Sequence, residues 1–188
     1  MLKPIEEFRK YVVITGFRDV RIENIDNFLK TISKKTPQNV ETQFFNAELV
    51  ATWQHLYFAA LNALTAFRNG ENFSKSLAME TMLYASAQRQ IRKATEIIGI
   101  KPNSTKIVAL IVGEKPEEVK SILSKISKQI GAKEDEAVLE LTDQKTAKIK
   151  EAFGISSEEL VAVVKGHDLQ EALVDVVIEK MALLATEH

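Results

Sequence analysis

Residues 106–112, KIVALIV, predict a β-strand that is apolar almost throughout and must therefore be covered by other elements. Three further strands are predicted at residues 10–17, 39–46 and 137–141. Helical spacing of apolar residues predicts helices at 22–34, about 48–68, 78–99, 116–130, 142–153 and 169–185. Ser156 with Glu159 predicts a capping box at the start of a further short helix. Because strands and helices do not alternate strictly, the sequence predicts an α+β fold, with one mixed or antiparallel sheet of four or more strands and about seven helices.

The length and composition are typical of a single soluble domain, expected to span residues 1–188. The sequence shows no internal repeat, low-complexity segment or linker. Residues 1–10 lack the apolar core of a signal peptide, and no apolar run approaches the ~20 residues of a membrane span. We therefore expect a cytoplasmic protein that does not associate with membranes.

The charge balance limits how the protein could bind nucleic acid. A net charge of −1 excludes a strongly basic binder, but the 25 basic residues could still form a local patch. The acidic run Glu134 to Glu136, which precedes a predicted strand, is interpreted as a solvated loop.

Neither a metal site nor a catalytic motif is predicted. The absence of cysteine excludes disulfides, thiolate zinc sites and cysteine nucleophiles, and the three histidines, His55, His167 and His188, are far apart. The sequence has no P-loop, GxGxxG, GxSxG or HExxH motif, so no cofactor is expected.

Residues 78–99, AMETMLYASAQRQIRKATEIIG, predict one continuous helix. Its apolar stripe is formed by Leu83, Ala87, Ile91, Ala94 and Ile98. The opposite face carries Ser86, Arg89, Arg92 and Lys93, with Gln88 and Gln90 on its flanks. Such a face could hold a phosphate backbone or the edges of bases. On spacing alone, a solvated face with an Arg92–Glu96 pair is the favoured interpretation.

The run MExxxxASxQRQIxxAxxIIGxK, at residues 79–101, resembles the small non-catalytic subunit of the KEOPS complex, the TPRKB-type partner of its atypical kinase. Residues 44–67 resemble the family's NA…VAT..H…A…A pattern, and residues 177–184 resemble its closing helix. Residues 39–113 match well, the C-terminal helix moderately, and residues 114–170 only by element order. The family usually has Gly where this chain has Ala87, which fits a helix better but narrows the approach of a ligand.

The resemblance implies a non-catalytic adaptor in KEOPS, which makes the threonylcarbamoyl modification on the adenosine next to the anticodon of certain tRNAs. Members of the family bind the small kinase directly and the other subunits indirectly. They stimulate the kinase's ATPase and help to recruit tRNA, in some members through its 3′ CCA end. Two alternatives remain: a small-molecule-binding or enzymatic α+β domain with a pocket near His55 and Arg89, and a structural dimer module.

Two surfaces are predicted for these partners. The residues predicted to bind tRNA are Lys75, Gln88, Arg89, Gln90, Arg92 and Lys93. Leu173, Val177 and Met181 of the last helix are candidate kinase contacts, although the apolar width of that helix is also explained by core packing alone. His55 is interpreted as a core histidine bonded to the backbone. Tyr84 is interpreted either as a base-stacking residue or as a half-buried one.

Overall fold

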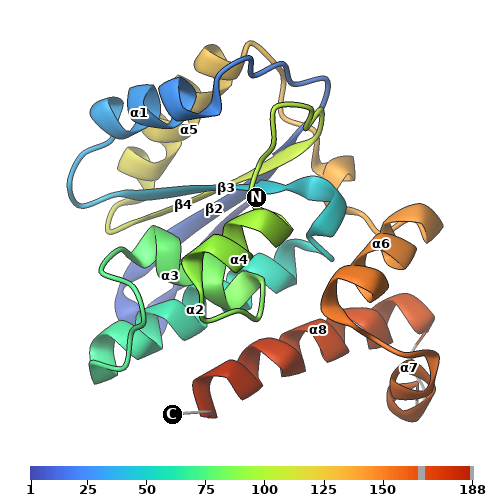
Figure 1. Ribbon diagram of the computed structural model, residues 1–188. Helices are drawn as coiled ribbons and strands as arrows, with labels where there is room; N and C mark the ends of the chain where they lie inside the picture. Colours follow the sequence, from blue (N-terminus) through green and yellow to red (C-terminus); the bar gives the residue numbers. More distant parts are fainter. Residues whose placement is uncertain (165–167, 187–188) are drawn as a thin grey trace. The chain divides into compact units, whose positions relative to one another are not determined.

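The computed structural model describes residues 1–164 and 168–186 (Figure 1), so His167 and His188 lie outside the described residues. The chain divides into two compact units. The first comprises Met1–Ala47 and Gly99–Val138, and the second comprises Glu48–Ile98 and Leu139–His188.

The α+β class is confirmed, with one four-stranded antiparallel sheet and the helices labelled α1 to α8 among the described residues. The single domain over residues 1–188 stays a prediction. No helix of the described part of the chain has the length and apolarity to cross a membrane.

The sheet lies in the first unit, with strand order β1-β2-β4-β3. Its strands are β1 (Leu2–Ile5), β2 (Lys10–Phe17), β3 (Glu41–Asn46) and β4 (Ile107–Gly113). The apolar run that predicted β4 is buried at every position and lies between β2 and β3. Val13 of β2 pairs with Ile111, and Phe44 of β3 pairs with Ala109.

The strands of the sheet differ from the predicted ones in two respects. Residues 137–141 do not form a strand, because Glu136–Leu139 coil into the 3-10 helix η3. A short apolar run such as AVLEL does not distinguish a strand from a helical turn. Strand β1, which contains Pro4, was not predicted from the sequence. A proline is tolerated there because β1 is an edge strand and one of its sides needs no hydrogen-bond donors.

Helices α1 (Ile25–Lys35) and α5 (Pro116–Ile130) pack on one face of this sheet (Figure 1). Phe28 of α1 contacts Phe44 of β3 edge-on, with ring centroids 5.0 Å apart. Val119, Ile122 and Ile126 of α5 are buried in the same cluster. Since the apolar stripes of both helices point to the sheet, their polar faces point away from it.

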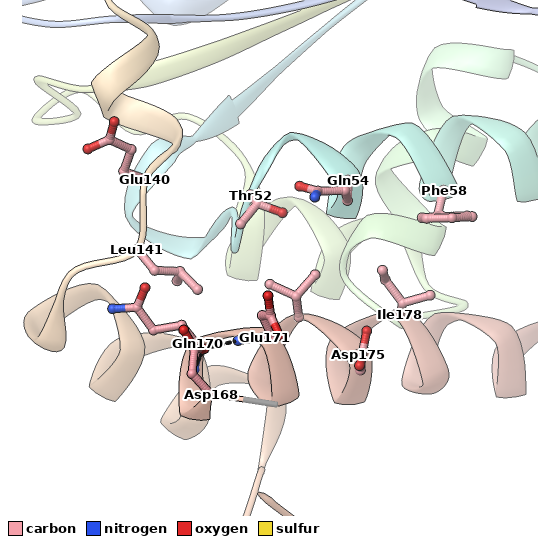
Figure 2. Close-up of a pocket in the computed structure, with 11 residues that line it drawn as sticks. Thr52, Gln54, Phe58, Glu140, Leu141, Asp168, Gln170, Glu171, Asp175 and Ile178 are labelled. Carbon is pink, nitrogen blue, oxygen red and sulfur yellow. Dashed lines mark hydrogen bonds between the residues drawn. The ribbon is translucent and has the colours of Figure 1, made fainter. Parts of the chain in front are cut away.

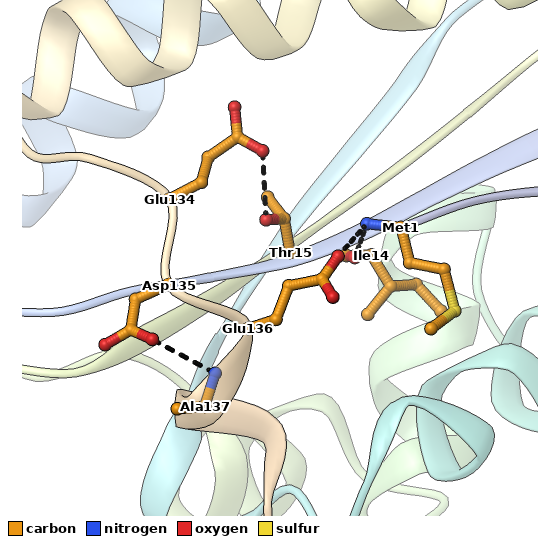
Figure 3. Close-up of polar contacts among 7 residues, drawn as sticks. All are labelled: Met1, Ile14, Thr15, Glu134, Asp135, Glu136 and Ala137. Carbon is orange, nitrogen blue, oxygen red and sulfur yellow. Dashed lines mark hydrogen bonds and ion pairs between the residues drawn. The ribbon is translucent and has the colours of Figure 1, made fainter.

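The acidic run that follows α5 is bonded to β2 and its neighbours (Figure 3). Glu134 accepts a hydrogen bond from the Thr15 hydroxyl at 3.3 Å. Asp135 accepts from Arg18 and from the N–H of Ala137. The hydrogen bond from Arg18 lowers the pKa of the Asp135 carboxyl. Glu134 and Glu136 are exposed, as predicted for a solvated loop, and the run in addition contacts the strand through these hydrogen bonds.

The second unit is helical. It contains α2 (Trp53–Asn69), α3 (Leu77–Ala85), α4 (Ile91–Ile98), α6 (Asp143–Phe153), α7 (Ser157–Val163) and α8 (Leu169–Thr186). A short 3-10 helix, η2 (Ala47–Leu49), precedes α2. Helix α8 packs against α2, α3, α6 and α7. The predicted capping box of Ser156 and Glu159 is present at the start of α7, and Gly70 ends α2 in the left-handed conformation with φ of 72°.

Candidate nucleic-acid interface and partner groove

The predicted continuous helix over residues 78–99 is interrupted, which corrects the expectation from the sequence. Helix α3 ends at Ala85 and α4 begins at Ile91. Between them Ala87 has φ of 51°, in the left-handed region. The N–H of Ala87 donates to Tyr84 O at 2.9 Å, and that of Gln88 donates to Leu83 O at 3.0 Å. This pair of hydrogen bonds is the Schellman ending of a helix, in which the left-handed position is usually glycine.

The break changes which side chains are exposed. Ile91, predicted on the apolar stripe, is 49% exposed. Ser86, predicted on the outer face, is buried, and its hydroxyl donates to Leu83 O. The signal for the break was the glycine that the resemblance implies at the position of Ala87, because a glycine inside a helical pattern marks a possible end. Alanine, the strongest helix former, hid that signal.

The structure places the predicted tRNA-binding residues around this break. Gln88, Arg89 and Gln90 form the loop, and Arg92 and Lys93 lie in the first turn of α4. All except the half-buried Gln88 are exposed, as is Lys75 before α3. The first turn of a helix carries unpaired N–H groups and a positive dipole end, which attract anions. The expected Arg92–Glu96 pair is present at 2.8 Å, but a pair this exposed contributes little stability.

A second loop, residues 70–76, approaches the first through an aromatic ring. The guanidinium carbon of Arg89 lies 5.6 Å from the ring centroid of Phe73, a side chain that is 36% exposed. A guanidinium stacked on an exposed ring offers two flat surfaces for stacking and N–H groups that donate hydrogen bonds. Proteins use such groups to bind single-stranded bases.

Glu80, to which the sequence assigned no role, holds this second loop in place. Its two carboxylate oxygens accept hydrogen bonds from the N–H groups of Phe73, at 3.1 Å, and Ser74, at 2.7 Å. Burial raises the pKa of Glu80, and the two backbone hydrogen bonds oppose that rise. Glu80 belongs to the run by which the family resemblance was identified. The sequence therefore pointed to this residue, but it did not show that Glu80 binds the backbone of the 70–76 loop.

His55 is a core residue, as interpreted. Its side chain is fully buried, Nδ1 accepts from the N–H of Ala51 at 3.1 Å, and Nε2 lies 2.7 Å from Ala85 O. Because Nδ1 is an acceptor, Nε2 carries the proton and donates. Burial lowers the pKa of His55 to about 4.

Tyr84 is also buried, so the base-stacking interpretation of this residue was wrong. Burial raises the pKa of its hydroxyl.

The pocket predicted near His55 and Arg89 is not formed by these residues. His55 is inaccessible. The pocket of about 230 Å³ beside the loop is lined by Ser86, Ala87, Gln88, Ala152, Phe153, Lys180, Leu183 and Leu184. Among the residues described, no group of three His, Cys, Asp or Glu side chains is arranged to hold a metal ion.

Leu173, Val177 and Met181 of α8 are fully buried. Leu173 and Val177 belong to a core cluster that also contains Ile149 and Leu160. Core packing therefore explains these three positions, and their side chains do not reach the surface. A partner that binds α8 must contact other residues of the helix.

A groove of about 700 Å³ runs between the start of α2 and α8 (Figure 2). Its apolar lining consists of Phe58, Leu141, Val174 and Ile178, and Phe58 is 38% exposed. Its charged lining, among the residues that the structure describes, consists of the carboxylates Glu140, Asp168, Glu171 and Asp175, without a lysine or arginine. The hydroxyl oxygen of Thr52, at the start of α2, lines the groove and is buried without a hydrogen-bond partner in the described part of the chain.

Comparison with known proteins identifies the family. The family model described as kinase binding protein CGI-121 matches residues 17–185. The chain belongs to this family. A curated CGI-121 relative, the regulatory protein Cgi121 of Methanocaldococcus jannaschii, is 32% identical over 145 residues, which cover 77% of this chain and 85% of the relative. The match confirms the family that the resemblance of the 78–99 run indicated, and both descriptions refer to binding or regulation.

Proposed function

We propose that this protein is a non-catalytic subunit of the KEOPS tRNA-modifying complex. In this role it binds and stimulates the complex's small atypical kinase and recruits tRNA through the 3′ CCA end. The family match supports kinase binding. The observation that carries the RNA part is the exposed loop at the α3–α4 break, which presents Gln88, Arg89 and Gln90 directly before the N-terminus of α4.

The loop has the chemistry of a reader of single strands. Arg89 over Phe73 provides a surface on which a base can stack, and the amides of Gln88 and Gln90 can bond to base edges. Arg92 and Lys93 place positive charge at the first turn of α4, where the backbone N–H groups of a helix have no acceptor within the helix. A terminal single strand with phosphates on one side and free base edges on the other fits these groups better than a duplex does.

The acidic groove between α2 and α8 is the proposed kinase contact in place of Leu173, Val177 and Met181. Its apolar floor and carboxylate rim fit a partner segment that carries apolar side chains on one face and basic ones on the other. The exposed ring of Phe58 supplies an aromatic anchor, the residue type enriched at interface centres. Such a contact leaves the core residues of α8 in place.

The tRNA proposal is tested with the double variant Arg89→Glu and Lys93→Glu. We expect loss of tRNA binding and a lower salt slope, and removal of CCA from the tRNA should have the same effect as the substitutions. The matched control is Lys101→Glu with Lys133→Glu, which changes the charge equally at two exposed positions of the first unit. Equal binding of trimmed and intact tRNA would exclude reading of the 3′ end.

The kinase proposal is tested by co-purification with the kinase subunit. Phe58→Gln with Asp175→Lys should abolish the complex, whereas Val161→Gln, at an exposed position of α7 outside the groove, should leave it unchanged. Intact binding by the groove variant would mean that the kinase contacts another surface. The purified protein alone should not turn over ATP, and the kinase's ATPase should rise on its addition.

A further inference from the structure

The polar faces of α1 and α5 carry six exposed lysines that share one property: none is paired with a carboxylate of the described residues. These lysines, which we call the lysine face, are Lys30, Lys34 and Lys35 of α1 and Lys120, Lys125 and Lys128 of α5. Lys35 donates to the Gln129 amide at 2.8 Å, and Lys125 donates to Lys35 O at 3.2 Å, so the two helices are joined within this face. The other four lysines make no side-chain hydrogen bond or ion pair within residues 1–164 and 168–186.

The carboxylates of these helices are confined to their first turns, at Asp26 in α1 and at Glu117 and Glu118 in α5. From residue 119 to residue 132 the sequence has three lysines, all of them on the lysine face, and no acidic residue. Two cations on the strand side of the same unit are paired, Lys10 with Glu114 and Arg18 with Asp135. Because the whole chain has a net charge of −1, this local excess reflects segregation of charge rather than a basic composition.

Helix dipoles account for part of this arrangement only. Lys34, Lys35 and Lys128 lie in the last turns of their helices, where a cation is favoured. Lys120 lies in the second turn of α5, nearer the end at which a cation is disfavoured, and Lys30 lies in the middle of α1. The dipole therefore gives no reason for the charge at these two positions.

The composition of the lysine face indicates the kind of partner. The exposed large apolar side chains of the described residues are Phe58, Phe73, Ile91, Val161, Leu169 and Leu183, and none lies on α1 or α5. A membrane-binding helix needs an apolar face, and a protein interface usually has an apolar or aromatic centre. Neither helix contains arginine, the residue that reads base edges by two parallel hydrogen bonds. Lysine acts as a point charge toward phosphate, and the serines between these lysines can donate to phosphate oxygens as well.

We propose that the lysine face binds the phosphate backbone of double-stranded RNA without reading its sequence. The inference rests on the proposed function in one respect only, since tRNA would be the natural source of that backbone. It assigns RNA contact to the first unit, in addition to the single-strand contact proposed for residues 88–93.

The test compares two double variants of the full chain that remove the same amount of charge. Lys120→Gln with Lys128→Gln changes the lysine face at side chains that make no hydrogen bond with the described part of the chain. Lys101→Gln with Lys133→Gln removes two exposed lysines outside it. Each is titrated, across a series of salt concentrations, with a blunt RNA duplex that lacks CCA and with a single-stranded oligonucleotide that ends in CCA.

For the duplex, we expect the lysine-face variant to bind several-fold more weakly. Its salt slope should be lower by about 2, because each lysine removed leaves one phosphate without its cation. Binding of the CCA oligonucleotide should be unchanged, and the control variant should bind both RNAs as the wild type does.

Two outcomes would overturn the proposal directly: equal weakening of duplex binding by both variants, or no weakening by either. Failure of the lysine-face variant to bind the kinase subunit, with duplex binding retained, would also overturn it, in favour of an acidic protein partner. A wild-type protein that binds the duplex but not the CCA oligonucleotide would refute only the reading of the 3′ end.

Discussion

The imidazole of His55 donates from Nε2 to the carbonyl oxygen of Ala85, 2.7 Å away, at the last residue of α3. Its other nitrogen accepts from the N–H of Ala51, ahead of α2. One buried side chain thus satisfies two backbone groups from segments 34 residues apart in the sequence, 51 and 85. Since Ala85 immediately precedes the loop with Gln88 and Arg89, this contact helps to set where that loop begins.

The first prediction concerns pH. The pKa of His55 falls from 6.5 to about 4 on folding, so protons bind more readily to the unfolded state, and stability is lost as pH falls from 6.5 toward 4. The difference corresponds to a loss of about 3 kcal/mol in the free energy of unfolding by pH 4. Urea unfolding of the wild type and of His55→Gln should show this loss in the wild type only. A similar slope in both proteins would assign the pH dependence to other groups.

The second prediction concerns Ala87. A Cβ at φ of 51° is strained, and glycine relieves that strain while adding freedom to the unfolded chain. Ala87→Gly should raise the free energy of unfolding by about 1 kcal/mol, measured by chemical denaturation, without weakening tRNA binding. The control is Ala94→Gly inside α4, which should instead destabilise. A loss of stability in Ala87→Gly would contradict the left-handed conformation of this residue.

The third prediction concerns Glu80. Glu80→Ala leaves two N–H groups of the 70–76 loop without an acceptor and should lower the free energy of unfolding by about 2 kcal/mol. Because the same loop carries Phe73 and Lys75, tRNA affinity should fall as well, whereas kinase co-purification should be retained. Glu80→Gln keeps one acceptor oxygen and should have an intermediate effect. Unchanged stability of Glu80→Ala would show that these two hydrogen bonds make no net contribution to the free energy of unfolding.

The fourth prediction separates core from surface on α8. Leu173→Ala removes a fully buried side chain and should cost about 2–5 kcal/mol of unfolding free energy. Leu183→Ala, at a position that is 51% exposed on the same helix, should cost within ~0.5 kcal/mol. Thermal unfolding of both variants measures the difference. A stable Leu173→Ala protein that no longer binds the kinase would restore Leu173 as a direct contact.

The elements with long periodic or fully apolar patterns were predictable from the sequence. The strand at residues 106–112, the helix that starts at Pro116 and the capping box at Ser156 are all present in the structure. Each depends on neighbours within one or two turns of the chain, so a local pattern suffices. The short segments were not predictable: β1 depends on pairing with β2, and the 137–141 run lacks such a partner among the described strands.

The sequence by itself determined the fold class, the family and the residue types around the α3–α4 break. Tertiary structure alone decided which of those residues are accessible. Buried neighbours enclose Tyr84 and the α8 residues Leu173, Val177 and Met181. The Schellman hydrogen bonds turn Ile91 outward. Exposure depends on contacts between segments distant in the chain, and a helical period identifies an apolar stripe without showing what covers it.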